Sequence, residues 1–482
     1  MTSYTHPADV RHLFELQRQA SREQVEVPML VRRERLLRLG KLLDEHAAVL
    51  AAAVQADFGI RSQRLTEVAD FFVLRSQLAH TLKKLSRWMK PQRMSTPLYL
   101  LPARGWIERQ PLGVVGIISP WNYPVQLALG PAIDALAAGN RVMIKTSELT
   151  PHTSAQLAGL VAQFFSPDEM CVVQGDAAVA ALVASLPFDH LVFTGSTAVG
   201  RKVAQAAAAN LTPTTLELGG KSPCIIDADC DLQDAALKIA HGKLLNAGQT
   251  CIAPDYVLLP RGKEGLFADA YRAAVARLFP YFEGNPDYAS IIDSRHLGRL
   301  RTMLQQAQTL GAQIEVMAAQ RDTPPPPPTS IGDGVARQMP PTLAFGVTQD
   351  MQLMQEEIFG PILPVISYER LDDAVAHINA SARPLALYWF GKSDAVRDSV
   401  LKRTVSGGVT VNDTLMHITH DRLPFGGVGD SGWGGYHGEQ GFLRFSHQKS
   451  VLAQSRFSAG AMLYPPYGPR FDRIMRLLKR LF

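Results

Sequence analysis

Apolar side chains recur at near-helical intervals in the segment that ends at about Lys90. They are Leu36, Leu37, Leu39, Leu42, Leu43, Val68, Phe71, Phe72 and Leu74. An apolar residue at every third or fourth position lines one face of an α-helix. The first part of the chain is therefore expected to be helical, with this face buried.

After Lys90 the pattern changes to short apolar runs, rich in β-branched residues, that alternate with Ala/Leu stretches. The runs predict strands at Gly113–Ser119, Arg141–Lys145, Cys171–Val173, His190–Thr194, Thr214–Leu218 and Ser222–Asp227. The stretches predict helices at Val125–Ala138, Thr153–Phe165 and Ala198–Asn210. Strands separated by helices indicate a parallel sheet covered on both faces, and nucleotides bind at the carboxyl ends of such strands.

A second α/β region follows. It begins with a predicted helix at Leu232–Leu245 and a strand at Tyr256–Leu259, and the alternation continues to about Asn412. Within this region Pro324–Pro328 can form neither a helix nor a central strand, so an exposed polyproline loop is expected.

The last residues predict a basic amphipathic helix. Its apolar face consists of Phe471, Ile474, Met475, Leu478, Leu481 and Phe482. The other face carries Arg470, Arg473, Arg476, Lys479 and Arg480. Such a helix packs on its own protein or on a sister subunit, which is the interpretation preferred, or it lies on an anionic membrane surface.

Composition and charge restrict the classes of protein. A chain of 482 residues with 46% hydrophobic and 19% charged residues is globular and long enough for two or more domains. No apolar run reaches the roughly 20 residues of a transmembrane helix, and the N-terminus is charged where a signal peptide is apolar. Together with only four cysteines, these features favour the cytoplasm. The net charge of +5 is small and no nucleic-acid-binding motif is present, so no nucleic acid partner is expected.

The stretch LNAGQTCIAPDY holds Cys251 on a loop that follows a predicted helix. A metal site is not expected, because Cys171, Cys224, Cys230 and Cys251 are too scattered for ligand spacing. A disulfide is disfavoured by the inferred compartment. An inert buried thiol is the ordinary role of a single cysteine. For Cys251 a nucleophile is the alternative, because two other segments offer groups that suit a thiolate.

Those groups are a carboxylate and an amide. Glu217 lies in the apolar run TLELGGKSP, where a carboxylate has either a partner or a role as a base with a raised pKa. The GGKS tail is not a phosphate-binding loop, because Thr215 stands where that motif needs its first glycine. Asn122 of SPWNYP stands at a strand-to-helix corner, where it could cap the helix or donate to an oxyanion.

Several segments together resemble the ordered motifs of the aldehyde dehydrogenase superfamily. They are SPWNYP, IKTSE, FTGSTAVG, LELGGKSP, NAGQTCIAP, QEEIFGP and PFGGVGDSG, and they span most of the chain. The segments APDY and GGYHG resemble the class 3 branch. Within that branch, NDTLMH is similar to the corresponding stretch of bacterial coniferyl aldehyde dehydrogenases.

The resemblance implies a Rossmann-like nucleotide-binding domain, an α/β catalytic domain and a small β oligomerisation element. The domains expected are 1–90 with 111–229 for the dinucleotide, 230–420 for catalysis, 91–110 with 421–460 as the bridging element, and 461–482 as the C-terminal helix. A homodimer is expected.

The resemblance also implies roles for individual residues. Cys251 would be the nucleophile, Glu217 the general base and Asn122 the side-chain donor of the oxyanion hole. The cofactor site would be made by Trp121, Lys145, Glu148, Gly195, Ser196, Glu357 and Phe359. Lys145 and Glu148 would hold the adenosine ribose, Ser196 and the helix after it would meet the pyrophosphate, and Glu357 with Phe359 would position the nicotinamide ribose. Thr146 departs from the proline usual in the family, but both ribose contacts remain.

The activity implied is oxidation of an aldehyde to its acid through a cysteine thiohemiacetal and thioester. Neither the chemistry nor the sequence calls for a metal. The cofactor expected is NAD, because Glu148 repels a 2′-phosphate, with NADP as the alternative. An aromatic, cinnamyl-type aldehyde is the expected substrate, and a medium or long-chain fatty aldehyde at a membrane surface is the alternative. A non-catalytic member of the fold would have lost the nucleophile or the base. An acylating enzyme that passes the thioester to coenzyme A is disfavoured by Glu217.

Overall fold

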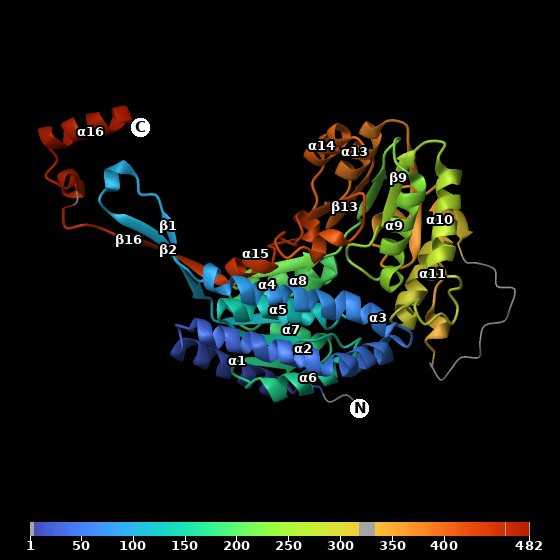
Figure 1. The fold of residues 1–482 in the computed structure, drawn as a ribbon, viewed down its shortest axis with the longest axis horizontal. Helices are drawn as coiled ribbons and strands as arrows, with labels where there is room; N and C mark the ends of the chain where they lie inside the picture. Colours follow the sequence, from blue (N-terminus) through green and yellow to red (C-terminus); the bar gives the residue numbers. More distant parts are fainter. Residues whose placement is uncertain (1–3, 318–332, 458, 482) are drawn as a thin grey trace.

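The first sheet has six strands, of which five are parallel (Figure 1). The computed structural model describes residues 4–317, 333–457 and 459–481. In spatial order the strands are β15 (Gly432–Trp433), β7 (Thr214–Leu218), β6 (His190–Gly195), β3 (Val114–Ile118), β4 (Arg141–Lys145) and β5 (Met170–Val173). Only the edge strand β15 is antiparallel to its neighbour. The predicted parallel sheet is confirmed.

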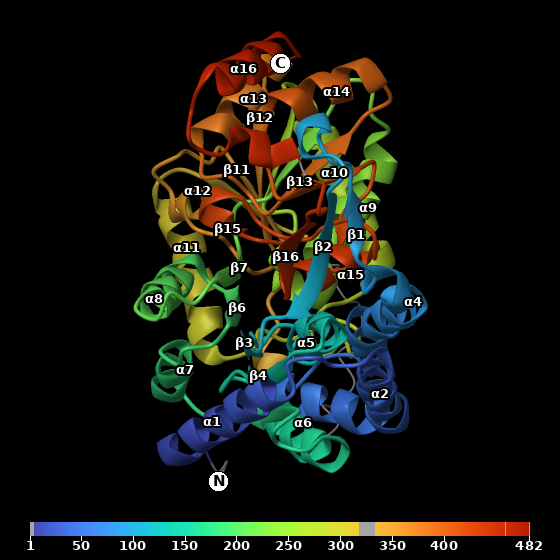
Figure 2. The same ribbon diagram turned by 90° about the vertical axis from the view of Figure 1, so that its left-hand side faces the viewer.

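Helices cover both faces of this sheet, because alternate side chains of each strand point to opposite sides. Val115 and Ile117 belong to the core under α2 (Met29–Phe58), α4 (Val73–Trp88), α5 (Gln126–Ala138) and α6 (Pro151–Phe164). Val114 and Ile118 belong to the core under α1 (Pro7–Glu23), α7 (Ala177–Ala184) and α8 (Thr197–Ala208). In Figure 2 the strands β6 and β7 lie between α7 and α8 on one side and α4 and α5 on the other.

The predicted helical face fails at two places near the N-terminus. On α2 Leu37 is 45% exposed, because it is adjacent to the buried Leu36 and neighbouring positions of a helix point in different directions. After α3 (Gln63–Thr66) comes a π-helical turn, Glu67–Phe72, which leads directly into α4. Val68 and Phe72 are each 62% exposed, whereas Phe71 and Leu74 are buried. A π turn takes an extra residue, so it rotates the positions on either side of it relative to an α-helical register.

The second sheet has seven strands. In spatial order they are β10 (Gln313–Val316), β11 (Thr342–Phe345), β12 (Ile362–Tyr368), β9 (Tyr256–Pro260), β8 (Pro223–Ile226), β13 (Ala386–Phe390) and β14 (Gly408–Val411). One face packs under α9 (Leu232–Leu244), α10 (Glu264–Leu278) and α11 (Ser294–Thr309), and the other under α13 (Leu371–Ala380) and α14 (Asp394–Arg403). Only β10, at one edge, is antiparallel.

One strand belongs to a different sheet from the one expected. The sequence predicts Ser222–Asp227 as a strand of the first sheet, but β8 pairs with β9 and β13 in the second. Conversely β15, expected in the bridging element, pairs with β7 in the first sheet. Strand pairing is a long-range choice that a local apolar run does not encode. The chain thus crosses between the sheets in the short segment after Leu218.

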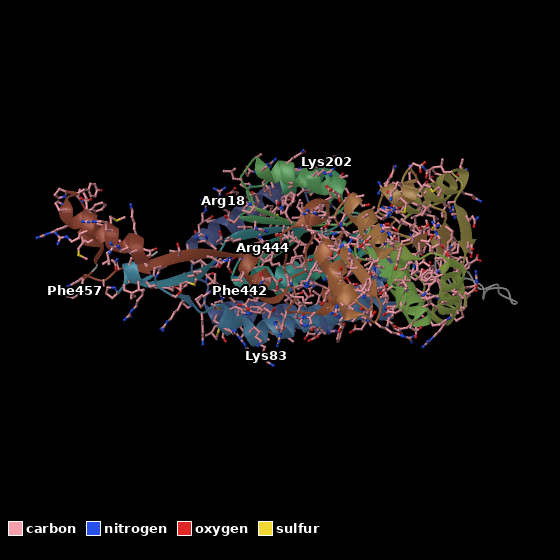
Figure 3. The ribbon with its side chains drawn as sticks, turned by 90° about the horizontal axis from the view of Figure 1, so that it is seen from above. Arg18, Lys83, Lys202, Phe442, Arg444 and Phe457 are labelled. Atoms are coloured by element: carbon pink, nitrogen blue, oxygen red, sulfur yellow. The ribbon has the colours of Figure 1, made fainter. Side chains whose placement is uncertain are left out.

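A three-stranded antiparallel sheet projects from the body as an arm, which consists of β1 (Gln92–Met94), β2 (Arg104–Pro111) and β16 (Ser446–Ala453) (Figure 1). α15 (Gly438–Arg444) packs at its root, and α16 (Pro469–Leu481) lies at its far end. Figure 3 shows Phe457 near that end and Phe442 at the body. α16 contacts the short helix Ala459–Leu463.

The remaining elements are short. They are α12 (Gln352–Gln355) and the 3₁₀ turns Leu98–Leu100, Leu245–Gly248, Val335–Arg337, Met416–Thr419 and Gly429–Ser431. The expected polyproline loop lies outside the described residues. Among the helices of the part that is described, none has the length and apolar character needed to cross a membrane.

Candidate active site

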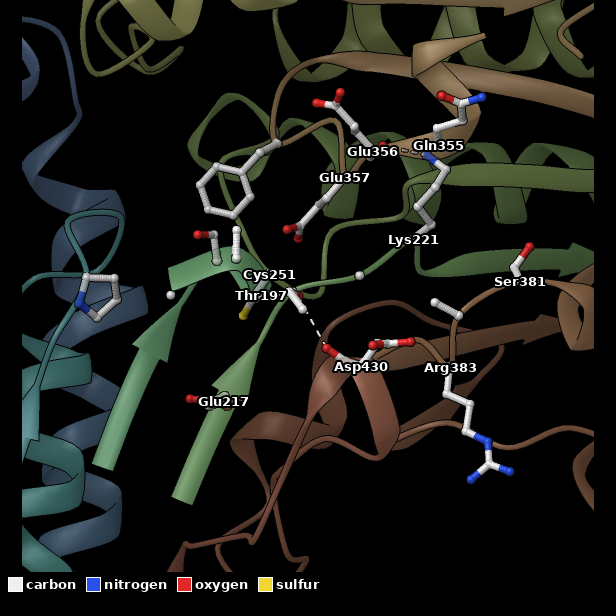
Figure 4. A pocket seen from close by; sticks show the side chains of 18 of the residues that line it. Thr197, Glu217, Lys221, Cys251, Gln355, Glu356, Glu357, Ser381, Arg383 and Asp430 are labelled. Atoms are coloured by element: carbon white, nitrogen blue, oxygen red, sulfur yellow. Dashed lines mark hydrogen bonds between the residues drawn. The ribbon is translucent and has the colours of Figure 1, made fainter. Parts of the chain in front are cut away.

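A cavity of about 860 Å³ lies where the two sheets meet (Figure 4). The first sheet contributes the carboxyl ends of β3, β6 and β7, which carry Asn122, Ser196 and Glu217. The second sheet contributes the loops that precede β9 and β12, which carry Cys251 and Glu357. The volume of the cavity is in the range of small-molecule sites. The cavity also lies at the carboxyl ends of strands, where α/β sheets bind ligands.

Cys251 is positioned by a left-handed turn after α9. Asn246, Ala247 and Gly248 have φ values of 51°, 53° and 78°, which turn the chain out of the helix. At Gly248 a Cβ would lie 2.3 Å from the Gly360 carbonyl oxygen, so only glycine fits. The turn brings the partly buried Cys251 side chain to the cavity, whereas Cys171 and Cys224 are buried in the two cores.

The surroundings of Cys251 have opposing effects on its thiol. Burial raises the pKa of the Cys251 thiol, and the nearby carboxyls of Glu217 and Glu357 raise it further. The backbone N–H groups of Cys251 and Ile252 lower the same pKa, because they stabilise negative charge on the sulfur. The thiol is therefore protonated at rest, and it must lose its proton before it attacks.

Asn122 does not cap the helix that follows it. Helix α5 has no side-chain cap, and the Asn122 Nδ2 instead donates to the Gln249 carbonyl at 3.1 Å. The Asn122 carbonyl accepts from Arg61 Nη1 at 2.5 Å and from Asn246 Nδ2 at 3.1 Å. The amide is thus fixed beside the Cys251 turn, and it keeps a second N–H for another acceptor.

Glu217 is buried at the end of β7 with one oxygen bonded and one free. Its Oε2 accepts from Tyr436 Oη at 2.8 Å and from Thr194 Oγ1 at 3.3 Å. Its Oε1 has no hydrogen-bond partner. Burial raises the pKa of Glu217 to about 7, although the two hydroxyl donors lower it. A carboxyl that titrates near neutral pH suits a general base.

Trp121, Glu357 and Phe359 meet in the same cavity. The Trp121 and Phe359 rings contact edge to face, with centroids 5.4 Å apart. A Cβ on Gly219 would lie 1.9 Å from Glu357 Oε2, so the glycine allows this carboxyl to approach the backbone. Burial raises the pKa of Glu357 to about 8, and Asp255 adds to the rise.

The first turn of α8 also faces the cavity. Ser196 caps the helix through Val199 N at 3.4 Å, and Gly195, Ser196, Thr197 and Ala198 line the cavity. The first N–H groups of a helix lack intrahelical partners and carry partial positive charge, which favours an anion. This end of the helix fits a pyrophosphate.

Lys145 and Glu148 lie at the end of β4, apart from the residues that line this cavity. Lys145 Nζ donates to Glu148 Oε2 at 3.3 Å. Burial lowers the pKa of Lys145, whereas Glu148 raises it. The Lys145–Glu148 pair is thus already formed. It lies at the same edge of the sheet as the ends of β3 and β6, because β4 is the neighbour of β3.

The sequence model of the aldehyde dehydrogenase family matches residues 2–451. The chain belongs to the aldehyde dehydrogenase family. A probable coniferyl aldehyde dehydrogenase of Pseudomonas aeruginosa is 49% identical over 444 residues, which cover 92% of this chain and 90% of that protein. The AldH of Staphylococcus aureus, solved in a substrate-bound state, superimposes with a TM-score of 0.89 at 35% identity and covers 97% of this chain and 99% of its own.

A second solved structure bears on the cofactor. Betaine aldehyde dehydrogenase of Staphylococcus aureus, solved with NAD⁺, superimposes with a TM-score of 0.83 at 25% identity and covers 94% of this chain and 91% of its own. The protein is therefore an aldehyde dehydrogenase that uses a nicotinamide cofactor. The expected family, fold and enzyme class are confirmed.

Sequence reasoning missed several residues of the aldehyde dehydrogenase site. Thr194 and Tyr436 hold Glu217, and His296 contacts Trp121 with ring centroids 5.2 Å apart. Lys221 and Arg299 also line the cavity. Tyr436 stands in the motif GGYHG, so a signal was present, but its partner was not evident from the sequence.

All four cysteines of the dehydrogenase are free thiols. Within the described residues, no group of three or more His, Cys, Asp or Glu side chains could hold a metal ion.

Proposed function

We propose that the dehydrogenase oxidises an aromatic aldehyde of the cinnamyl type, such as coniferaldehyde, to the carboxylic acid with NAD. The family and the relatives named for coniferyl aldehyde support the substrate class. The observation that carries the proposal is the meeting of Cys251, Glu217 and Asn122 in one cavity with Glu357 and Phe359.

The Cys251 sulfur is the proposed nucleophile. As a thiolate it adds to the aldehyde carbonyl carbon, which forms a C–S bond and leaves negative charge on the oxygen. Because the resting thiol is neutral, its proton must leave first. That proton passes to solvent, and the backbone N–H groups of Cys251 and Ile252 stabilise the thiolate that remains.

The developing oxyanion is met by two donors. They are the free N–H of the Asn122 amide and the backbone N–H of Cys251. Donors that are already fixed are worth about 3 kcal/mol each in such a site, because they do not reorganise during the reaction. Arg61 and Asn246 hold the Asn122 backbone and so keep the amide in place.

A nicotinamide ring bound in the cavity supplies the hydride acceptor. Glu357 would hold its ribose hydroxyls, and Trp121 and Phe359, which line the same cavity, would position the ring. The α8 first turn, with Gly195 and Ser196, would hold the pyrophosphate. Lys145 and Glu148 would hold the adenosine ribose, and the Glu148 carboxylate disfavours a 2′-phosphate.

Hydrolysis of the thioester completes the turnover. Glu217 removes a proton from water, the water oxygen adds to the acyl carbon, and the Cys251 sulfur leaves as a thiolate. The free Oε1 of Glu217 is the atom available for that proton.

The alternative substrate is a medium or long-chain fatty aldehyde, with peripheral membrane association. The feature that favours it is α16, whose exposed face carries Arg470, Arg473, Arg476, Lys479 and Arg480. Basic amphipathic helices bind anionic lipid surfaces. The preferred proposal remains a homodimer in the cytoplasm, in which α16 packs on protein.

The substrate proposal is tested by kcat/KM for coniferaldehyde, benzaldehyde and decanal, each with NAD and with NADP. We expect the highest value for coniferaldehyde with NAD. A higher value for decanal, together with sedimentation of the protein with phosphatidylglycerol vesicles, would replace the aromatic proposal by the alternative.

A further inference from the structure

A largely buried cluster of charges lies at the wall of the cavity. The Asp255 side chain, only 3% exposed, accepts from Lys221 Nζ through Oδ2, and its Oδ1 lies 3.8 Å from Lys243 Nζ. Lys243 is wholly buried, its Nζ has no hydrogen-bond partner, and burial lowers its pKa to about 8. Packing alone does not explain two cations and one carboxylate in a largely buried site, because apolar side chains of similar size are often as stable.

The cluster connects the three segments that build the proposed site. Lys221 follows Glu217 in the crossing between the sheets, and Asp255 follows Cys251. The Asp255 N–H donates to the Ser222 carbonyl at 2.8 Å, which ties the second segment to the first. Its Oδ1 accepts from Ile358 N at 3.1 Å, which ties both to the segment that holds Glu357 and Phe359.

Charged side chains also hold the carbonyls of that third segment. Lys221 Nζ donates to Leu353 O at 2.6 Å and to Glu356 O at 3.1 Å. Arg299 donates to Glu357 O at 3.1 Å and to Ile358 O. Figure 4 shows Lys221 extending toward the Gln355 and Glu356 segment, with the Glu357 carboxyl on the cavity side. The backbone from 356 to 358 is therefore fixed by charged side chains at the wall of the cavity.

The segment needs this restraint. Phe359 has a φ of 52°, a conformation that an aromatic residue adopts only when its surroundings enforce it. The Glu357 carboxyl is buried beside Gly219 and has the Asp255 charge near it. Without external bonds, the segment would relax and turn both side chains away from the cavity.

We propose that Asp255 is a positioning residue that acts through Lys221 and the Ile358 N–H. It holds residues 356–359 in the conformation that receives the nicotinamide half of the cofactor. This inference rests on the proposed function, because Glu357 and Phe359 are assigned to that cofactor there. Asp255 touches neither the substrate nor the thiol.

The test compares Asp255→Asn with Glu169→Gln in the full-length protein. Asn keeps the size and the acceptor for Ile358 N but removes the charge that pairs with Lys221. Glu169 pairs with Arg35 at 2.9 Å and Arg38 at 2.8 Å on the far side of the first sheet, so Glu169→Gln is a matched control for the loss of a partly buried ion pair. The measurements are the Kd for NAD by calorimetry, the KM for NAD, kcat and Tm.

We expect Asp255→Asn to weaken NAD binding and raise the KM for NAD by about tenfold, because a loosened support misplaces the groups that it orients. kcat at saturating NAD should change much less. The control, Glu169→Gln, should have a lower Tm but should bind NAD with the same Kd as the wild type.

A second pair of variants covers the case in which Asp255→Asn does not fold. Lys221→Met removes the bridge to Leu353 and Glu356, whereas Lys221→Arg keeps a cation with several donors. Weak NAD binding in Lys221→Met that Lys221→Arg largely restores supports the proposal.

Unchanged NAD binding in folded Asp255→Asn or Lys221→Met, with only Tm lowered, overturns it. Absence of NAD binding in the wild type would overturn the proposed function itself, and that result is distinguishable because it needs no variant.

Discussion

At the scale of single residues, the Cys251 thiol and the Glu217 carboxyl are proposed to act in different steps of the reaction. In the proposed reaction Cys251 makes the covalent bond, whereas Glu217 activates the water that ends the turnover. Both line the same cavity, and the Glu217 carboxyl contributes to the raised pKa of the Cys251 thiol. Their removal should therefore block different steps.

We expect Cys251→Ala to form no reduced nicotinamide with any aldehyde. Glu217→Gln should release about one reduced nicotinamide per site and then stop, because the thioester is no longer hydrolysed. Rapid mixing with detection of reduced cofactor absorbance separates the two outcomes. Steady turnover by Glu217→Gln at the wild-type rate would remove Glu217 as the base.

The pH dependence of hydrolysis follows from the same carboxyl. Because the pKa of Glu217 is raised to about 7, it is protonated below that pH and cannot accept a proton from water. The rate of acyl-enzyme hydrolysis should fall about tenfold per pH unit below the midpoint and level off above it. The measurement is single-turnover release of the acid from preformed acyl-enzyme across the pH range.

Tyr436→Phe provides the matched control. The Tyr436 hydroxyl donates to Glu217 Oε2 at 2.8 Å and stabilises the charged carboxylate. Its removal should therefore raise the pKa of Glu217 and move the midpoint to higher pH. A midpoint that stays in place would show that another group controls the profile.

The sequence points more readily to the residues proposed for the chemistry than to those that support them. Cys251, Glu217 and Asn122 stand in motifs, and all three line the cavity. Tyr436 lies more than two hundred residues from Glu217 in the chain, and Arg299 binds backbone carbonyls rather than side chains. Such contacts depend on the packing of distant segments, which residue types and spacing do not encode.

At the scale of elements, the π-helical turn Glu67–Phe72 anchors the Asn122 corner. It holds Asp70 against Arg61, with 2.9 Å between Asp70 Oδ2 and Arg61 Nη2 and both side chains wholly buried. Asp70 Oδ1 also accepts from Gln126 N at 3.0 Å, at the start of α5. Arg61 in turn donates to the Asn122 carbonyl.

We expect Asp70→Asn to lower the free energy of unfolding by about 3–5 kcal/mol, because it leaves the buried Arg61 charge unpaired. kcat/KM should fall as well, since Arg61 no longer holds Asn122. Urea denaturation and steady-state kinetics measure the two effects. Glu45→Gln, which breaks an exposed 3.8 Å pair with Lys41, is the control and should change stability by less than about 1 kcal/mol. Equal losses in the two variants would contradict the anchoring role.

Most elements followed from local periodicity. The predicted strand Arg141–Lys145 is β4 to the residue, and the predicted helix at Val125–Ala138 is α5 from Gln126. The exceptions are features that the local sequence does not decide. β8 is as apolar as β7 but pairs in the other sheet, and Val68 and Phe72 are exposed because a π turn changes the register.

At the scale of the whole molecule, the arm exposes apolar side chains that a lone chain would bury. Leu98 is 80% and Phe457 is 89% exposed, and Tyr464 and Tyr467, which follow Phe457 along the chain, are exposed as well. Apolar patches of this kind mark interfaces between proteins. The proposed homodimer would use this surface.

We expect the wild type to sediment at twice the chain mass of 52.7 kDa. The double variant Leu98→Ser, Phe457→Ser should sediment as a single chain, because the exposed side chains contribute to the interface and not to the core. Leu266→Ser on α10, where the leucine is 63% exposed on the body, is the control and should remain dimeric. A double variant that stays dimeric would exclude the arm tip as the contact.

The short crossing after Leu218 puts the carboxylate and the thiol on separate sheets, so each partner can evolve with its own scaffold. Strand ends of the first sheet can accumulate changes that retune dinucleotide preference without touching the sulfur. Loops of the second sheet hold the sulfur together with the groups assigned to the nicotinamide half of the cofactor, so a change there bears on both. A variant is therefore easier to confine to one function when it is made in the first sheet.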